Sequence, residues 1–199
     1  MFVPPHFKSP EIETLKKLLP LASFATLIST DETGVPFATH LPVSFSETSG
    51  EAHDVIYGHV SKANAHHGLF SKPALMIFSG PHAYVSPRMY ASDINVPTWN
   101  YVAVHAYGTP KPVEDTDKVT EILQTLTREN EGENPWSMDE LDDRRIQGLM
   151  KGIVAFEMPI DRLEAKAKLG QNKSAEDRQA LYEALKDTDI AAWQKSVLD

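Results

Sequence analysis

Cysteine is absent from the 199 residues of this sequence. That absence excludes disulfides, thiolate nucleophiles and sulfur-ligated metal sites together. Any chemistry must therefore come from histidine, carboxylates, hydroxyls or a bound cofactor. The composition thus directs attention to a cofactor.

Long apolar runs are also missing. No stretch approaches the roughly 20 apolar residues that a membrane-spanning helix needs. The start, MFVPPHFKSPE, has neither a basic leader nor the apolar core of a signal peptide. We therefore expect a cytoplasmic protein that does not associate with membranes.

Positive charge is scarce. Lysine and arginine number 19 against 28 aspartates and glutamates, which gives a formal net charge of −9 and a pI near 5.3. DNA-binding domains usually carry a basic face that displaces counterions from phosphates. The balance of charge therefore disfavours direct DNA binding.

Motifs for metal-dependent or serine hydrolase chemistry are lacking as well. There are eight histidines, but the HExxH spacing does not occur, and the adjacent His66 and His67 would point to opposite sides of a strand. No G-x-S-x-G elbow occurs either. We predict no metal site and no Ser/His/Asp triad.

The sequence does contain many short segments rich in β-branched and aromatic residues, separated by turn residues. We predict a hairpin of strands 23–30 and 35–45 around the turn at 31–34, then strands at 55–60, 74–79, 83–86, 101–107 and 152–158. Gly80-Pro81 is expected to separate the strands at 74–79 and 83–86. Helices are predicted at 10–19, 63–70, 115–130 and 138–150, and over the charged segment 174–199.

Strands without βαβ alternation favour an antiparallel barrel over a parallel sheet. The predicted fold class is α+β, mainly β, with peripheral and C-terminal helices. We expect residues 1–199 to form one domain that ends in a helical segment at about 174–199. A small barrel fills its own interior, so a ligand is expected at its mouth or at a subunit interface.

Two segments in the first half concentrate polar residues within strands. Thr39-His-Leu-Pro42 is either an edge strand that ends at its proline or a strand end facing a planar ligand. Gly58-His-Val-Ser-Lys-Ala-Asn64 is either a strand leading into a helix capped by Ser61, or an anion site made by Ser61, Lys62 and backbone N–H groups.

Two more such segments lie in the second half. In Val96-Pro-Thr-Trp-Asn-Tyr101, core packing explains the Trp and Tyr, but Thr98 and Asn100 would also suit the edge of a flat ring system. Lys168-Leu-Gly-Gln-Asn172 is either an ordinary loop before a helix or a cation with two amides for a phosphate or a ring edge.

The order of these segments resembles a known family. MFVPPHF, HLP, GHVSKAN, IFSGPHAYVSP, VPTWNYVAVHAYG, GIVAFEMPI and KLGQN follow one another as in the PaiB-type FMN-binding proteins, over nearly the whole length. VPTWNY and GPHAYVSP are the most specific of these motifs. The resemblance implies a split β-barrel of the pyridoxamine-phosphate-oxidase kind, a homodimer, and FMN between the two subunits.

The same resemblance implies a set of cofactor-binding residues. Ser61, Lys62 and Asn64 match the segment near the phosphate, and His40, Leu41 and Pro42 match the strand beside the flavin. Thr98, Trp99 and Asn100 would lie close to the ring, and Lys168, Gln171 and Asn172 would complete the site.

Three positions depart from the family pattern. The chain has Met89 where Trp is frequent, Gly170 where Ser is frequent, and Lys62 where Arg is common. Lysine keeps the positive charge but loses the bidentate fork of arginine, so this departure bears on phosphate affinity rather than on the fold.

Three functions stay open from the sequence. The family suggests a repressor-like FMN-binding regulator. A flavin reductase or oxidase is the second, with His40, His59 or Tyr101 available for proton transfer. Binding or degradation of haem, known among related split barrels, is the third.

Overall fold

The structure of the protein is a computed structural model that describes residues 1–18, 23–46, 55–133 and 135–198. The chain divides into two compact units. Unit 1 comprises residues 1–17, 79–104 and 164–199, and unit 2 comprises residues 18–78 and 105–163. No helix in the described ranges is both long enough and apolar enough to cross a bilayer.

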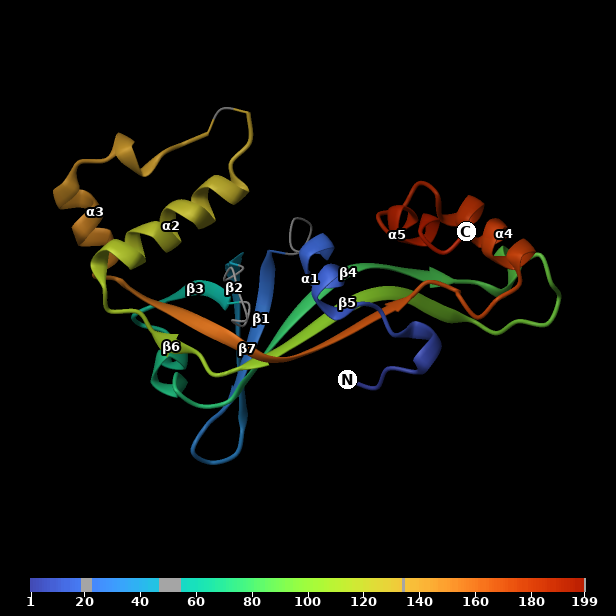
Figure 1. The fold of residues 1–199 in the computed structure, drawn as a ribbon, viewed down its shortest axis with the longest axis horizontal. Helices are drawn as coiled ribbons and strands as arrows, with labels where there is room; N and C mark the ends of the chain where they lie inside the picture. Colours follow the sequence, from blue (N-terminus) through green and yellow to red (C-terminus); the bar gives the residue numbers. More distant parts are fainter. Residues whose placement is uncertain (19–22, 47–54, 134, 199) are drawn as a thin grey trace. The chain divides into compact units, whose positions relative to one another are not determined.

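Seven strands form the sheet (Figure 1). They are β1 (Phe24–Thr30), β2 (Pro36–Ser46), β3 (Val55–Ser61), β4 (Ala74–Val85), β5 (Thr98–Gly108), β6 (Lys111–Pro112) and β7 (Ile153–Lys168). By the bounds of the two units, β4, β5 and β7 each contribute residues to both.

Helices lie before, between and after the strands. The α-helices are α1 (Glu11–Leu18), α2 (Thr116–Asn130), α3 (Asp143–Met150), α4 (Ala175–Leu185) and α5 (Ala191–Lys195). The 3₁₀ helices are η1 (Pro5–Phe7), η3 (Ala65–Leu69), η4 (Pro87–Met89) and η5 (Met138–Glu140).

The strand order β3-β2-β1-β4-β5-β7-β6, with a further pairing of β3 to β7, closes a ring of six strands. The closing pair is antiparallel and runs from Val55 opposite Pro159 to Ser61 opposite Ile153. The predicted antiparallel barrel and the α+β, mainly β, fold class are confirmed. The hairpin of β1 and β2 is also confirmed, with Thr30 opposite Pro36 across the turn.

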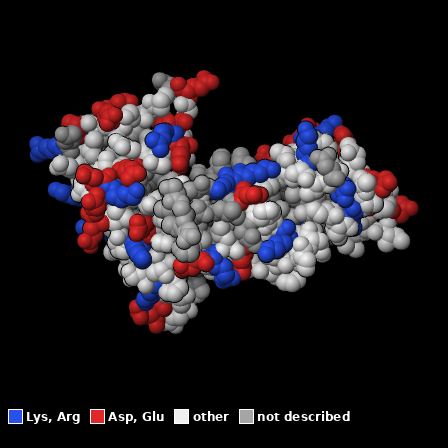
Figure 2. All heavy atoms as spheres, viewed as in Figure 1, with Lys and Arg blue, Asp and Glu red and all other residues white. Residues whose placement is uncertain are grey.

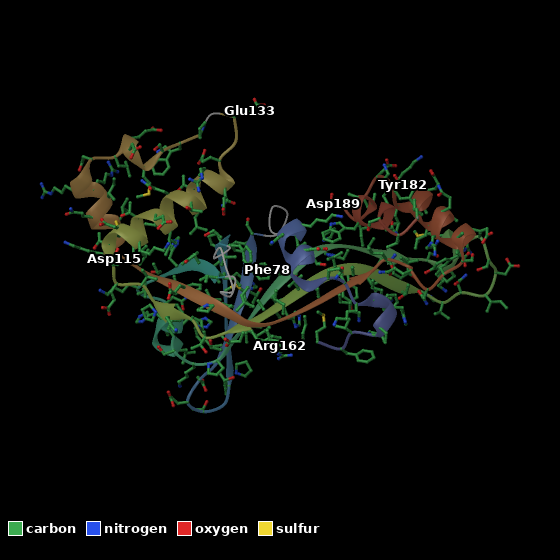
Figure 3. All side chains as sticks on the ribbon, in the orientation of Figure 1. Phe78, Asp115, Glu133, Arg162, Tyr182 and Asp189 are labelled. Atoms are coloured by element: carbon green, nitrogen blue, oxygen red, sulfur yellow. The ribbon has the colours of Figure 1, made fainter. Side chains whose placement is uncertain are left out.

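The core of unit 2 fills the barrel with alternate side chains from its strands. Leu27, Ile56, Met76, Phe78 and Phe156 are all fully buried. Figure 3 labels Phe78, a residue of β4. A second apolar cluster packs Val119, Ile122 and Leu126 of α2 against Ala155 of β7, and the Asp115 carboxylate starts that helix by accepting from the N–H of Lys118.

The core of unit 1 combines strand residues with the C-terminal helices. Ala83, Val85 and Val102 are buried in the strands, and α4 and α5 supply the buried Leu181 and Trp193. Figure 1 shows α4 and α5, in red, beside β4 and β5. The predicted C-terminal helices are confirmed, and Ser174 caps α4 by accepting from the N–H of Asp177.

Two predicted strand boundaries were wrong because of proline. The predicted strands 74–79 and 83–86 belong to one strand, β4, which runs from Ala74 to Val85 with Gly80-Pro81 within it. The register with β1 ends at Ile77, so Pro81 falls beyond that pairing, where a missing N–H is tolerated. Likewise β7 continues past Met158 to Lys168, since Pro159 lies at the last pair with β3.

The predicted helix at 138–150 was wrong in another way. It is two elements, η5 and α3, because Leu141 between them is extended. Ser137 caps the first, and the Asp142 carboxylate accepts the N–H of Arg145 to start the second. A side chain that caps a new helix competes with continuation of the previous turn.

Candidate functional site

His40, Leu41 and Pro42 lie in β2 beside β1, where His40 is opposite Thr26 and Pro42 opposite Phe24. The pairing of β2 with β3 begins only at Val43. Along these residues β2 pairs with β1, and its pairing with β3 has not yet begun, which fits an edge. The strand does not end at Pro42, as both interpretations had assumed, because β2 continues to Ser46.

The His40 side chain is exposed and held at one ring nitrogen. Its Nδ1 lies 2.9 Å from the Thr26 hydroxyl. Its ring stacks on Phe24 at a centroid distance of 6.2 Å and an interplanar angle of 18°. Phe24 is 65% exposed, so two stacked rings face outward beside Pro42.

Ser61, Lys62 and Asn64 follow at the end of β3, in a turn that uses its own backbone donors. The Lys62 N–H donates to the Gly152 carbonyl at 2.8 Å, and the Asn64 N–H to the Ser61 carbonyl at 2.8 Å. The Ala63 N–H donates to the Ser61 hydroxyl at 3.2 Å. The backbone part of the predicted anion site is thus engaged within the chain, which leaves the Ser61 hydroxyl and the Lys62 ammonium to meet a phosphate.

The cap of the following helix differs from the sequence interpretation. Asn64 rather than Ser61 caps η3, because its carboxamide oxygen accepts the N–H of His66 at 2.9 Å. Asparagine is among the best N-cap residues. Ser61 lies three positions too early for that role.

One hydroxyl joins the two candidate segments of unit 2. The Asn64 amide donates to Thr39 Oγ1 at 3.1 Å, and Thr39 directly precedes His40 in β2. His66 Nδ1 lies 2.8 Å from the same hydroxyl and His66 Nε2 lies 3.1 Å from Ser29 Oγ. The segments 40–42 and 61–64 are therefore brought together in space.

His66 was not identified from the sequence as a site residue. Its two ring nitrogens nevertheless contact Thr39 of β2 and Ser29 of β1, and so connect η3 to both strands. Its side chain is completely buried, and its ring meets Phe37 edge-on at a centroid distance of 5.1 Å. Burial lowers the pKa of the His66 ring below its ordinary value of 6.5. The sequence predicted a helix after β3, but the cap at Asn64 and the pairing of His66 with Thr39 became clear only from the fold.

Thr98, Trp99 and Asn100 open β5 in unit 1. Trp99 is 53% exposed, so the core-packing interpretation of this tryptophan is wrong. Its ring lies 6.1 Å from His82 and 5.8 Å from Tyr84. An exposed aromatic cluster of this kind can cover a flat ligand.

Asn100 has the opposite environment. It is 1% exposed, and its Nδ2 finds no hydrogen-bond acceptor among the described residues. A buried amide without a partner is costly, about 1 to 3 kcal/mol in proteins. A carbonyl or ring nitrogen of a flavin is the kind of acceptor that such a donor suits.

Lys168, Gln171 and Asn172 lie at and just after the end of β7. The Lys168 ammonium donates to the Thr98 hydroxyl, so these two predicted residues are in contact. Gln171 uses its amide on the strand end: it donates to the Ala167 carbonyl at 2.5 Å and accepts from the Leu169 N–H at 2.8 Å. Gln171 thereby shapes this loop, while Asn172 is exposed.

Three lysines gather around this strand end. Burial lowers the pKa of Lys168, and the charges of Lys166 and Lys173 lower it further. Lys166 is 9% exposed and lies 5.2 Å above the Tyr101 ring. Lys173 donates to Asn95 Oδ1 at 2.5 Å. This lysine cluster gives unit 1 a positive region that the cofactor prediction captured only through Lys168.

The loop before Trp99 is tied to α4 by a contact that sequence reasoning missed. The Asp177 carboxylate accepts from the N–H and the hydroxyl of Ser92, at 2.9 and 2.8 Å. These bonds lower the pKa of Asp177. The acid, which flanked the lysines in the sequence, therefore serves as an anchor.

Comparison with known protein families identifies the family of this chain. Residues 1–162 match the protein family described as "Putative FMN-binding domain". The chain belongs to this family. The predicted resemblance and the FMN cofactor are thereby confirmed, while the segment 168–172 lies outside the matched range.

A curated relative matches nearly all of the chain. The "Protease synthase and sporulation protein PAI 2" of Bacillus subtilis is 34% identical over 190 residues, which covers 94% of this chain and 90% of the relative. This chain is an FMN-binding, PaiB-like protein.

Solved structures support the fold. The FAD and heme binding protein from Mycobacterium smegmatis aligns with a TM-score of 0.59 at 18% identity, covering 82% of this chain and 74% of that one. The flavocytochrome Anf3 from Azotobacter vinelandii aligns with a TM-score of 0.58 at 19% identity, covering 82% and 70%. At these identities the likeness concerns the fold.

Proposed function

We propose that this protein is an FMN-binding regulator of the PaiB kind that works as a homodimer in the cytoplasm. The identity to a relative whose name links it to protease synthesis and sporulation supports the regulatory part. The exposed apolar side chains of unit 1, among them Ile94, Val96 and Trp99, support the homodimer. The net charge of −9 suits a protein surrounded by water.

Two sets of residues are proposed to contact FMN. In unit 2 they are His40, Leu41, Pro42, Ser61, Lys62 and Asn64, and in unit 1 they are Thr98, Trp99, Asn100, Lys168, Gln171 and Asn172. The side chains of Ser61 and Lys62 would meet the phosphate. Trp99 would cover the ring, and Asn100 and Lys168 would bind its polar edge.

One contact carries this proposal. The Asn64 amide bonds to Thr39 and so fixes the turn at 61–64 against the strand at 40–42. A cofactor that has both a phosphate and a ring needs these two kinds of surface held at a constant separation. The sequence distance between the segments offers no such constraint without the fold.

Bound FMN would supply electron or hydride transfer, and the protein would supply binding, orientation and electrostatic tuning. A second candidate function, a flavin-dependent reductase or oxidase, is favoured by the lysine cluster. Positive charges near a flavin stabilise its reduced, anionic form. Lys168, whose pKa is lowered, is the cation of the cluster that belongs to the proposed flavin set.

The absorption spectrum of the purified full chain tests the proposal, with the released cofactor identified by mass spectrometry. We expect flavin bands and FMN. A Soret band instead would support haem binding, and a colourless protein that takes up no added FMN would contradict the proposal. Rapid oxidation of reduced nicotinamide dinucleotides by the FMN-loaded protein would favour the oxidoreductase over the regulator.

A further inference from the structure

A cavity of about 620 Å³ lies in unit 2 where α2 and α3 meet the start of β7. Val119 of α2, Met150 of α3 and Ile153 of β7 line it. Figure 1 shows α2 and α3 next to each other, beside the start of the orange β7 ribbon. Pockets that hold small ligands range from about 300 to 1,000 Å³, so this cavity has the size for one.

One wall of the cavity is apolar. It is formed by residues of the apolar cluster in which α2 packs against β7, on a side where that cluster is not fully covered. Val119 and Ala155 are buried in that cluster, while Val113, Met150 and Ile153 pack against it and are only partly buried. All five also line the cavity. An apolar group in the cavity would therefore complete the burial of side chains that the chain itself covers only in part.

The polar lining has an excess of positive charge. Lys62 and Lys151 contribute two ammonium groups, against one carboxylate from Glu114. Within the described residues, the structure records neither a hydrogen bond nor an ion pair for the ammonium group of either lysine. The proposed FMN site would use the Lys62 ammonium, and Lys151 then remains as the cation beside the apolar wall, a combination that suits an anion with an apolar body.

We propose that this cavity binds a small amphipathic anion, a carboxylate with an apolar body, whose charge meets Lys151 and whose body packs on Val119 and Met150. The site goes beyond the proposed FMN function. Of the twelve residues proposed to contact FMN, only Lys62 lines the cavity. A regulator of the PaiB kind would gain from it a second ligand, a small molecule to which it can respond.

Calorimetric titration with octanoate tests the charge and the apolar body together. The FMN-loaded full chain should bind octanoate saturably. Octan-1-ol, which has the same chain without the charge, should bind at least about tenfold more weakly, and octylamine more weakly still. Equal affinity for the three ligands would overturn the proposal, since the lysines would then play no part.

Variants place the ligand in the cavity. Lys151→Ala should weaken octanoate about tenfold, as expected for one charge-assisted hydrogen bond. Met150→Trp should abolish binding by filling the space. Lys186→Ala, which removes an exposed lysine of α4 paired with Glu183, should leave the affinity unchanged. Retained FMN absorbance and an unchanged Tm would show that each variant folds.

The titration also separates this proposal from the FMN function. If the chain binds no FMN, octanoate binding to the flavin-free protein and its loss in Lys151→Ala still test the cavity. If FMN competes with octanoate, the cavity belongs to the flavin and the proposal of a second ligand is overturned. Unchanged octanoate binding in both Lys151→Ala and Met150→Trp would overturn it as well.

Discussion

Lys62 extends an exposed side chain from the end of β3, and its backbone N–H is already bonded to Gly152. Only the ammonium group can thus meet a phosphate. We expect Lys62→Ala to weaken FMN by about 1.5 to 3 kcal/mol, the range for a hydrogen bond to a charged group, and to leave riboflavin nearly unaffected. Fluorescence titration with both flavins measures the difference.

Lys72→Ala is the matched control for that experiment, because Lys72 is another exposed lysine of unit 2 and pairs with Glu32. It should change neither affinity. Equal losses of FMN and riboflavin in Lys62→Ala would place this lysine away from the phosphate.

His66 sets a pH dependence of stability. Its pKa is lowered in the folded protein by burial and returns to about 6.5 on unfolding, so the unfolded chain binds more protons just below that pH. The stabilisation is complete above about pH 6.5 and is lost as the pH falls toward the lower, folded pKa. We expect urea unfolding to show a falling free energy between about pH 7 and pH 5.

His66→Gln should flatten this dependence and lower the free energy of unfolding near pH 7 by roughly 1 to 3 kcal/mol, because Thr39 and Ser29 lose a buried partner. His59, whose pKa is also lowered by burial, would leave a residual slope. His6→Gln, at an exposed position, should keep the original slope. A variant of His66 with the full pH dependence would show that this ring is not the titrating group.

At the scale of elements, β5 and β7 lie very close together at Gly108. A Cβ at this position would lie 2.2 Å from the Pro159 carbonyl oxygen, a contact that side chains do not make. We expect Gly108→Ala to destabilise the protein by more than about 2 kcal/mol, since the backbone must shift. Urea denaturation gives the change in free energy.

Gly148→Ala provides the opposite outcome in the same unit. Gly148 lies inside α3, and a Cβ there would meet nothing within 4 Å. Alanine is a better helix former, so this variant should be more stable by about 0.5 to 1 kcal/mol. Similar effects of the two substitutions would contradict the close approach at Gly108.

The elements show where sequence reasoning succeeds. Turn residues at 31–34 predicted the hairpin, and the spacing of Val119, Ile122 and Leu126 predicted α2, because these signals are local. Pro81 and Pro159 misled the prediction, since the effect of a proline depends on whether the neighbouring strand is paired at that residue. That pairing is a property of the fold.

In the candidate site, too, single residues could be predicted from the sequence, whereas the contacts between them depend on the fold. Lys168 and Thr98 were both predicted, yet their contact depends on the neighbouring positions of β5 and β7 in the sheet. The burial of Asn100 beside an exposed Trp99 follows from which face of β5 is covered, and alternation alone does not say which. The cavity beside α3 could not be predicted at all, because it forms among distant segments.

For the whole molecule, we expect a homodimer. Tyr84, Val96 and Trp99 leave large exposed apolar surfaces on unit 1, and an obligate dimer typically buries more than about 2,000 Å². Tyr84→Glu should weaken the dimer, whereas Leu149→Glu, at another exposed apolar residue, should not. Analytical ultracentrifugation at micromolar protein measures both, and a monomer that keeps FMN would refute the dimer.

DNA binding is the second property of the whole molecule. Lys166, Lys168 and Lys173 form a positive cluster that a phosphate backbone could contact, but Lys166 is buried and Lys168 is bonded to Thr98. Figure 2 shows acidic and basic side chains interspersed on the visible face. We expect duplex DNA to bind no more tightly than the non-specific range of about 10⁻⁴ to 10⁻⁶ M at physiological salt.

A salt-dependent titration against the DNA upstream of the protein's own gene, with competitor DNA, measures that affinity. Sequence-selective binding at nanomolar protein would show that the chain contacts DNA directly. Regulation without such binding would have to pass through a partner protein or a small molecule.

The closure of the barrel by β3 and β7 affects how the chain can be made. Val55 pairs with Pro159, so a ribosome must release most of the chain before the last strand arrives. Until then the edges of β3 and β5 present unpaired backbone groups to other nascent chains. Pairing across so much sequence also folds slowly. The yield of this protein in cells should therefore depend on chaperones that shield those edges during synthesis.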